Sequence, residues 1–487
     1  MKTIILGLAA ALFLLALSST SAMASRSQQS VVDDPARILS PDPALQTVAL
    51  DEAKELGFDI LKIPVTWRSF APDGTSSVKP AVDLTNSENY PAGVWTTVDA
   101  AVAGAEARGM KVWLMITAPA PRWAVTKETS PGAGAYEPNP ADYAEFVTAV
   151  GKRYANARYF SFWNEVNLKR FMQPQSKGGL AQSAIHYRDM YRAAQKALAS
   201  SGHASSTTLF GEILSRYPSD NATLATRPMI WLRAFFCLDT KGLALKGNAA
   251  KKYKCGSFPK IKTSGLAYHP YNLSFPPTAL EKNKENAPIG YLPRVEKLLD
   301  QAYKAKHLAT KKLKIYNSEY GIQSNPPDRS TGQPLSKVPF YLNASEYLTW
   351  IDARVATYSQ YLLIDDPEIE NVVSFQTGLR FADGTKKPGV YEAFQTPFMV
   401  FKTANANTVT VWGCLRAKTP GTATAKLEVK TNGKWTSVKS IPVSASTGYF
   451  MQKINLTGAK SKTYRINWSG GISRWSKPGT QLKNQTN

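Results

Sequence analysis

Two glutamates occupy positions from which they could act together on one substrate. Glu165 ends the segment FWNE at residues 162–165, and Glu319 ends the segment YNSE at residues 316–319. Two carboxyl groups about 5–5.5 Å apart, one protonated and one ionised, can cleave a glycosidic bond with retention of configuration. The alternative is that both are ordinary carboxylates at helix N-termini, where the helix dipole favours negative charge.

The elements that must position these glutamates are apolar runs that alternate with helical stretches. The runs are apolar on both faces, which is typical of parallel strands covered by helices. This order predicts an α/β fold, a (β/α)8 TIM barrel. A doubly wound open sheet is the rival, but no Gly-x-Gly-x-x-Gly motif follows the first strand. We expect strands at residues 30–32, 60–67, 111–116, 159–163, 208–213, 265–269, 313–316 and 371–375, and helices at residues 48–57, 94–109, 139–154, 184–199, 294–305 and 346–363.

Within this barrel Glu165 ends the fourth strand and Glu319 ends the seventh. Catalytic groups of TIM barrels stand at the carboxyl ends of the strands. Strands four and seven face each other across the barrel mouth, so the two carboxyl groups can approach the separation that retaining hydrolysis needs.

These paired motifs resemble those of clan A of the glycoside hydrolases, and within the clan the chain looks closest to family 39 and to family 5-like secreted bacterial enzymes. The resemblance rests on Asn164-Glu165 after the fourth strand and on SEYG at residues 318–321 after the seventh. It implies that Glu165 is the general acid/base, that Glu319 is the nucleophile, and that Asn164 bonds the 2-hydroxyl of the sugar.

The same resemblance points to His269 and Tyr271, which end the sixth strand where the clan places residues near the nucleophile. A tyrosine hydroxyl there can orient the carboxylate and tune its pKa, although both residues could serve packing alone. The chain also departs from the clan. Lys62 stands where many members have an arginine that braces the nucleophile, and a lysine lacks the bidentate geometry. Phe375 and Gln376 stand where many members end the eighth strand with tryptophan.

Further candidates for substrate contact follow the other strands. Trp67 and Trp123 come after strands two and three and could form sugar platforms, with core packing as the alternative. Glu212 ends strand five and could contact the substrate or pair with a nearby arginine. Gln376, after the expected eighth strand, is a candidate for hydroxyl recognition.

The two ends of the chain predict processing and a second domain. Residues 1–24 have Lys2, an apolar run at 4–17 and a small-x-small pattern that ends at Ala24, which predicts a signal peptide cleaved after Ala24 and a secreted, extracellular or wall-associated protein. A membrane anchor is the alternative, but the run is shorter than the roughly 20 residues of a membrane span. Residues 25–397 are assigned to the catalytic barrel. Short period-two strands at 398–476 predict a β-sandwich, and residues 477–487 a flexible tail.

The net charge of +23, from 59 basic and 36 acidic residues, favours acidic partners: an anionic polysaccharide, the cell wall, a membrane surface or nucleic acid. Solubility or adhesion to a wall is the alternative explanation of this charge. No zinc-finger spacing, RNP-like motif or basic helix indicates nucleic-acid binding. Cys237 and Cys255 could pair in an oxidising compartment, which leaves Cys414 over. No cysteine–histidine cluster has metal spacing, so we expect no metal and no cofactor. We also expect a monomer without stable membrane insertion.

Together these features predict a retaining hydrolase for β-linked bonds of a polysaccharide or oligosaccharide. Two alternatives stay open. One is a carbohydrate-binding or wall-attached protein that has lost turnover, and the other is a transglycosidase that uses the same two carboxylates. Fold alone does not decide among them.

Overall fold

The computed structural model describes residues 25, 27–129, 133–217, 219, 221–256, 260–368, 374–416 and 424–486. The expected signal peptide, residues 1–24, lies outside these residues.

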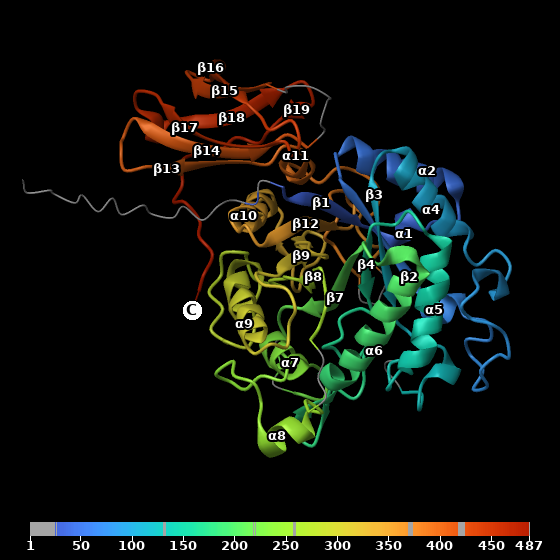
Figure 1. Ribbon diagram of the computed structural model, residues 1–487. Coiled ribbons are helices and arrows are strands. Elements are labelled where there is room, and N and C mark those ends of the chain that lie inside the picture. Colours follow the sequence, from blue (N-terminus) through green and yellow to red (C-terminus); the bar gives the residue numbers. More distant parts are fainter. Residues whose placement is uncertain are drawn as a thin grey trace, which may run out of the picture.

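Eight parallel strands of the described chain close into a barrel, which confirms the predicted fold class (Figure 1). The first strand pairs with both the second and the last, so the sheet has no free edge. In chain order the barrel strands are β1 (Gln29–Asp33), β2 (Ile60–Thr66), β3 (Lys111–Thr117), β4 (Tyr159–Phe162), β7 (Thr207–Leu214), β8 (Gly265–His269), β9 (Lys314–Asn317) and β12 (Val355–Tyr361).

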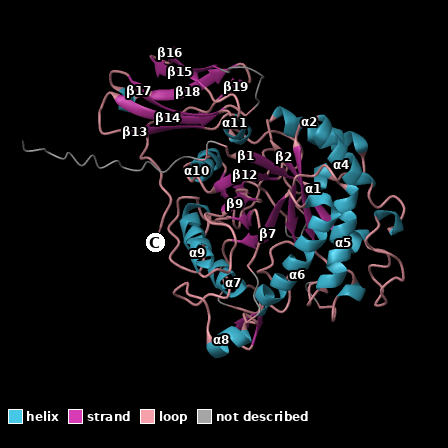
Figure 2. Ribbon diagram, in the orientation of Figure 1, coloured by secondary structure: helices cyan, strands magenta, loops and turns pink. Residues whose placement is uncertain are grey.

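Helices cover the outside of the barrel (Figure 2). Helix α5 shows how the sequence starts one of them: the Asn139 side chain accepts hydrogen bonds from the backbone N–H groups of Ala141 and Asp142, and Pro140 takes the first helical position. The longer helices are α2 (Pro43–Glu55), α4 (Thr96–Ala107), α5 (Pro140–Arg153), α6 (Gln182–Leu198), α7 (Pro228–Phe235), α9 (Leu292–Lys304) and α10 (Val338–Trp350), and the shorter ones are α1 (Pro35–Ile38), α3 (Trp67–Phe70), α8 (Gly247–Lys252) and α11 (Val390–Gln395).

The eighth strand is not where the sequence pattern placed it. The expected helix at 346–363 divides into the end of α10 and the whole of β12, whereas most of the expected strand at 371–375 lies outside the described residues. The apolar residues Leu348, Ile351, Val355 and Tyr358 recur at intervals of three and four, which imitates a helix. The prediction was wrong because β12 is buried on both faces and therefore has no polar alternation.

Side chains that point into the barrel form layers. Near the amino ends of the strands the interior is apolar, with Val31, Ile60, Trp113, Leu209 and Ala267 packed together. Inward positions recur every second residue along a strand. The next layer, toward the carboxyl ends, therefore consists of the residues two positions further on, and several of these are polar or charged.

A pair of antiparallel sheets follows the barrel, as expected for the β-sandwich. One sheet has the order β13 (Phe398–Lys402), β14 (Thr408–Cys414), β17 (Tyr449–Asn455), and the other has the order β16 (Lys434–Pro442), β15 (Thr424–Thr431), β18 (Thr463–Trp468), β19 (Gly471–Ile472). Their facing sides share one apolar core, which includes Val411 and Leu427. Cys414 lies buried at the end of β14, where its thiol donates to the carbonyl oxygen of Thr447.

The three-stranded sheet packs on the barrel helix α10. Trp350 of α10 lies 6.0 Å from Trp412 and 5.9 Å from Tyr449, measured between ring centroids. Inside this contact Glu346 pairs with Arg416 and accepts a 2.6 Å hydrogen bond from the Tyr449 hydroxyl. The order of layers is thus barrel, three-stranded sheet, four-stranded sheet (Figure 1).

The C-terminal tail, whose flexibility stays a prediction, makes hydrogen bonds to the barrel side. Gln481 donates to the Tyr347 hydroxyl at 2.7 Å, Asn484 donates to the Leu348 carbonyl at 3.0 Å, and the Gln485 N–H donates to the Gly290 carbonyl at 2.7 Å.

Cys237 and Cys255 form a disulfide, as the sequence suggested. The bridge joins the segment after α7 to the segment after α8. Among the described residues, no helix combines the length and the apolar character required to span a bilayer.

Candidate active site

The site is built on the polar layer of the barrel interior. Two residues beyond the apolar layer, β1, β2, β4 and β8 supply Asp33, Lys62, Ser161 and His269. Strand β7 would place Gly211 in this layer, but its register shifts between Gly211 and Ile213. Such a bulge lets an extra residue turn inward, and here that residue is Glu212, with φ of 56°.

The expected acid/base residue is held by an unusual turn. Immediately after β4, Trp163 and Glu165 have φ of 73° and 35°, a backbone conformation that residues other than glycine seldom adopt. Trp163 is fully buried and its indole N–H donates to the Phe171 carbonyl at 2.7 Å. The buried ring therefore fixes a backbone conformation that turns Glu165 toward the barrel mouth.

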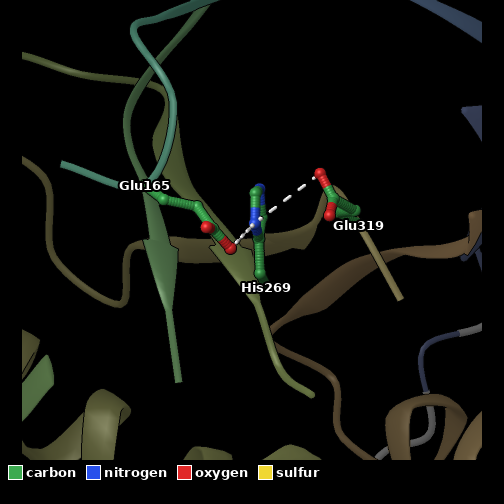
Figure 3. A group of neighbouring side chains, drawn as sticks. All are labelled: Glu165, His269 and Glu319. Atoms are coloured by element: carbon green, nitrogen blue, oxygen red, sulfur yellow. Dashed lines mark hydrogen bonds and ion pairs between the residues drawn. The ribbon is translucent and has the colours of Figure 1, made fainter. Parts of the chain in front are cut away.

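Glu165 and Glu319 approach each other as the sequence predicted (Figure 3). One carboxylate oxygen of each, together with one ring nitrogen of His269, lie within 4.8 Å of one another. Both carboxylate side chains are 15% exposed, so both are accessible from the mouth. This separation suits a retaining double displacement and is too short for a water molecule to be accommodated as inverting enzymes require.

His269 lies between the carboxylates, with a side chain that solvent does not reach. Its Nδ1 is 3.1 Å from Glu165 and 3.7 Å from Glu319, and its Nε2 is 2.6 Å from Glu212. Burial by itself would lower the pKa of His269, but the charge of Glu319 and the hydrogen bonds to Glu165 and Glu212 raise it to about 10. An imidazolium has two N–H groups, so His269 can donate one to Glu165 and the other to Glu212. The Nδ1–H group bonds one oxygen of Glu165, and the second oxygen of Glu165 remains available to hold a proton.

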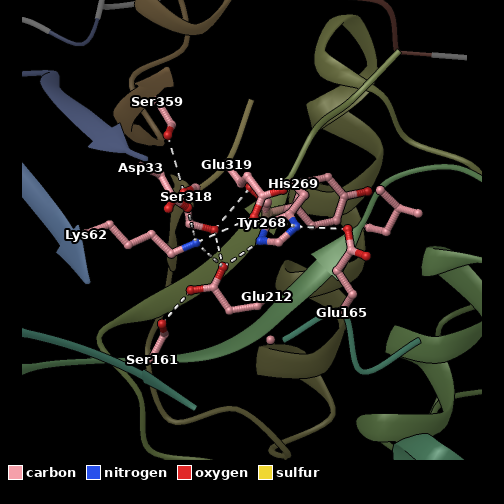
Figure 4. A network of polar contacts seen from close by, with 12 residues as sticks. Asp33, Lys62, Ser161, Glu165, Glu212, Tyr268, His269, Ser318, Glu319 and Ser359 are labelled. Atoms are coloured by element: carbon pink, nitrogen blue, oxygen red, sulfur yellow. Dashed lines mark hydrogen bonds and ion pairs between the residues drawn. The ribbon is translucent and has the colours of Figure 1, made fainter. Parts of the chain in front are cut away.

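Beneath Glu165 and Glu319 lies a buried network of charges (Figure 4). The Lys62 ammonium is 3.0 Å from Asp33, 3.4 Å from Glu212 and 3.8 Å from Glu319. Glu212 also accepts hydrogen bonds from Ser161 and from Ser318, the latter at 2.6 Å. Each charge is therefore paired, as buried charges must be.

The charges of this network set the pKa values of Glu212 and Glu319. Burial favours the neutral form of Glu212, yet the Lys62 charge and the hydrogen bond from His269 outweigh it and lower the pKa to about 2. Burial raises the pKa of Glu319 to about 7, opposed by the charges of His269 and Lys62 and supported by those of Asp33 and Glu165. Glu212 is thus a permanent anion, whereas Glu319 changes its charge near neutrality.

Comparisons with known proteins address the fold. No protein-family model and no curated protein matches the chain. A solved family 39 glycoside hydrolase from the gut symbiont Bacteroides cellulosilyticus WH2 is similar over 88% of this chain and 80% of its own, with a TM-score of 0.51 and 14% identity. The chain has the fold of the clan A glycoside hydrolases.

Other solved structures are similar at lower scores. GH5_18 from Bifidobacterium longum has a TM-score of 0.46 and 14% identity over 76% of this chain and 78% of its own. The family 1 β-glucosidase from Thermotoga maritima has a TM-score of 0.43 and 13% identity over 71% of this chain and 84% of its own.

Tyr271 lies against the expected nucleophile. Its hydroxyl donates to Glu319 at 3.0 Å, and its ring stacks 5.9 Å from that of Tyr320. Burial and the charge of Glu319 raise the pKa of Tyr271 well above its usual value, so the hydroxyl remains a donor. Tyr271 and His269 therefore hold the two oxygens of Glu319 from different sides.

Replacing Tyr271 with phenylalanine is expected to lower kcat/KM by roughly 10–100-fold, because a hydrogen bond to a charged group contributes about 1.5–3 kcal/mol. The matched control is Tyr268→Phe in β8, three residues earlier in the chain, whose hydroxyl donates to the Ala287 carbonyl at 3.0 Å. Steady-state kinetics on an aryl β-glycoside provide the measurement. An equal loss in both variants would assign Tyr271 a packing role.

Asn164 lies beside Glu165 with its amide partly exposed. Its side-chain oxygen is buried and makes no hydrogen bond with the described residues. Buried polar atoms normally have a partner, so this oxygen is suited to a hydroxyl group of a bound ligand.

Several expected substrate contacts are not available to a sugar. Trp67 is 1% exposed and packs among the rings of Trp123 and Trp163, so it belongs to the core. Glu212 is fully buried beneath the catalytic pair and its partners are Lys62 and His269 rather than an arginine. Both predictions were wrong because burial, which the sequence does not show, removes these side chains from the cleft.

The prediction that Gln376 recognises a sugar hydroxyl was also wrong. It is 2% exposed, and its amide nitrogen donates to the Asp366 carbonyl and to the Ser374 hydroxyl, each at 3.2 Å. Because the eighth strand is β12, Gln376 belongs to a later loop. Trp123 is half-buried, with its indole N–H donating to the Pro72 carbonyl, so its predicted contact with sugar stays a prediction.

Sequence reasoning missed Asp33, Ser161 and Ser318, which complete the buried network. A signal existed for two of them: Asp33 and Ser161 lie on short apolar strands at inward-facing positions. It also missed Tyr361 at the end of β12, where burial and the nearby charge of Glu319 raise the pKa of the phenol.

Glu165, His269 and Glu319 also have ligand atoms close enough to hold a metal ion. The donor set does not fit this use, however, because a metal requires neutral imidazole. Both ring nitrogens of His269 lie close to carboxylates, Nδ1 3.1 Å from Glu165 and Nε2 2.6 Å from Glu212, an environment that favours the protonated ring.

Proposed function

We propose that this chain is a retaining glycoside hydrolase that cleaves β-linked bonds of a polysaccharide or oligosaccharide by double displacement. The observation that carries the proposal is the approach of Glu165 and Glu319 to within 4.8 Å at the barrel mouth. Two carboxyl groups at this separation can flank one anomeric carbon.

In the first step Glu319 attacks the anomeric carbon while Glu165 protonates the leaving oxygen. His269 donates to Glu165, and Tyr271 stabilises the ionised Glu319. In the second step Glu165 takes a proton from water, which attacks the glycosyl-enzyme and releases the sugar with its original configuration. In both steps the Asn164 amide binds the 2-hydroxyl, a role supported by its side-chain oxygen, which has no partner among the described residues.

We also propose that the protein acts outside the cell. The apolar N-terminal segment supports export, and the Cys237–Cys255 disulfide is typical of an oxidising compartment.

The direct test is a panel of neutral and acidic polysaccharides and aryl β-glycosides, with Glu165→Gln and Glu319→Gln beside the wild type. We expect the wild type to release product and both variants to lose it. Polymer binding without product from any of the three proteins would instead support a binding protein. Transfer to an added sugar acceptor in preference to water would support a transglycosidase, and activity surviving in both variants would mean that the carboxylates are misassigned.

The pH dependence follows from the charge of Glu319. The Glu319 carboxyl, with its pKa of about 7, must lose its proton before it can attack the anomeric carbon. The value of kcat/KM should therefore fall about tenfold for each pH unit below about 7. The midpoint belongs to the coupled carboxylate pair rather than to one residue. The pH profile of kcat/KM on an aryl β-glycoside checks this, and an acid limb centred below pH 5 would contradict it.

A further inference from the structure

Positive charge is concentrated in the sandwich. From Phe398 to the C-terminus the chain has 14 lysines and arginines and a single acidic residue, Glu428, whereas the whole chain has 59 basic and 36 acidic residues. More than half of the net charge of +23 therefore comes from fewer than a fifth of the residues. One of the 14, Arg416, is neutralised by its buried pair with Glu346.

The four-stranded sheet turns one face away from the rest of the molecule. Its inner face, with Leu427 and Ile466, packs on the three-stranded sheet, which in turn packs on α10. Figure 1 shows β15, β16 and β18 on the side of the sandwich farthest from the barrel. Neither the other sheet nor the barrel covers this outward face.

The outward face has the side chains that alternate with the core residues. Lys426 and Lys430 of β15 are exposed on it, and Arg465 of β18 is partly exposed. The only carboxylate of the sandwich, Glu428, lies between them, but it accepts hydrogen bonds from Arg465 at 2.6 Å and Asn467 at 3.0 Å. Burial alone would raise the pKa of Glu428, yet these two donors lower it. The lysines therefore lack a competing free anion on this face.

Rings and neutral polar groups accompany the charges. Trp435 pairs with Lys430 across β15 and β16, and the Arg465 guanidinium lies 4.4 Å from the centre of its ring. Trp475 is 58% exposed, and its neighbour Ser476 pairs with Tyr464 of β18, so it extends the same sheet. Rings of this kind can stack on the apolar faces of sugars, and lysines can pair with acidic groups along a chain.

We propose that the outward face of the four-stranded sheet binds an anionic polysaccharide. Lys426 and Lys430 make the ionic contacts on this face, and the exposed Lys434, which pairs with Thr431 at the hairpin turn between β15 and β16, adds charge at its edge. The choice of a polysaccharide among polyanions rests on the proposed function, because a polymer held by the sandwich would then be presented to the barrel of the same molecule. The binding itself does not depend on turnover.

The experiment uses the full chain with Glu319→Gln, so that bound polymer is not degraded. Affinity electrophoresis measures binding to polygalacturonate, with dextran as the neutral polymer. The test variant adds Lys426→Gln, Lys430→Gln and Lys434→Gln. The matched control adds Lys54→Gln, Lys297→Gln and Lys304→Gln, which are exposed lysines of the barrel helices and remove the same total charge.

We expect the test variant to bind polygalacturonate at least about tenfold more weakly than Glu319→Gln alone, and the control to change less than about twofold. Binding should also weaken as salt is added, and less steeply in the test variant. An equal loss in both triple variants, or no binding of polygalacturonate at low salt, would overturn the proposal.

A further binding measurement distinguishes a polysaccharide from other polyanions. Tighter binding to a single-stranded DNA 30-mer, or to vesicles containing phosphatidylglycerol, than to polygalacturonate at equal salt would reject the polysaccharide.

Hydrolysis of a soluble aryl β-glycoside is measured with the three lysine substitutions in the otherwise wild-type chain. Unchanged hydrolysis with lost polymer binding supports the docking face, whereas polymer binding by a chain without any hydrolysis would reject only the proposed function.

Discussion

Glu319→Ala is expected to lower hydrolysis of a dinitrophenyl β-glycoside by at least about 10⁴-fold, because no glycosyl-enzyme can form without the nucleophile. Azide should restore product release in this variant. It would enter the space left by the carboxylate and attack the anomeric carbon directly, so the glycosyl azide should have the inverted, α configuration. Proton NMR of the product reads the configuration.

Glu165→Ala is expected to give the opposite stereochemistry. A dinitrophenyl group leaves without protonation, so the glycosyl-enzyme forms on Glu319 and then accumulates. Azide that attacks this intermediate from the side of the missing acid/base should yield the β-glycosyl azide. Glu145→Ala, which removes a helix carboxylate paired with Lys79, is the control and should keep full activity. If the two configurations were exchanged between the variants, the roles of Glu165 and Glu319 would be reversed.

Lys62→Met is expected to destabilise the fold by about 3–5 kcal/mol, because it leaves Asp33 and Glu212 buried without the ammonium that lies between them. The same change removes a positive charge 3.8 Å from Glu319, and that charge lowers the pKa of this carboxyl. The acid limb of the activity profile should therefore move to higher pH. Urea unfolding and the pH profile of kcat/KM measure the two effects.

Lys387→Met is the matched control for this change. Lys387 is also buried, but its ion pair is with Asp365, at 2.7 Å. We expect it to lower stability without moving the acid limb. If Lys62→Met destabilised the protein and left the acid limb in place, Lys62 would have a structural role only.

The sequence identified those candidate site residues that lie at the ends of barrel strands. Glu165 and Glu319 stood out because each directly follows an apolar run, and the barrel topology then brings the two runs to opposite sides of one mouth. His269 and Tyr271 were added by the resemblance to clan A, which places such residues at the end of the sixth strand. The buried charge network beneath Glu319 was harder to predict. Lys62 was noticed only because it replaces an arginine of the clan, and its partner Asp33 is on the neighbouring strand.

The remaining errors have physical causes. Strand β12 was taken for helix because a strand buried on both faces has no alternation, and its apolar residues happened to recur at helical intervals. Glu212 was assigned to the cleft because a one-residue bulge cannot be seen in the sequence, and the bulge turns this side chain into the polar layer. Trp67 and Gln376 were misassigned because exposure depends on loops that pack over them.

The buried pair of Glu346 and Arg416 makes barrel and sandwich a single cooperative unit. A chain shortened to its barrel would leave Glu346 without Arg416 and Tyr449 and would expose the apolar side of α10 around Trp350 to solvent, so it should aggregate rather than fold as a smaller protein. The sandwich therefore cannot be gained or lost as a freely shuffled module. If the sandwich docks on a polymer, the barrel that packs against it is therefore brought to the same polymer.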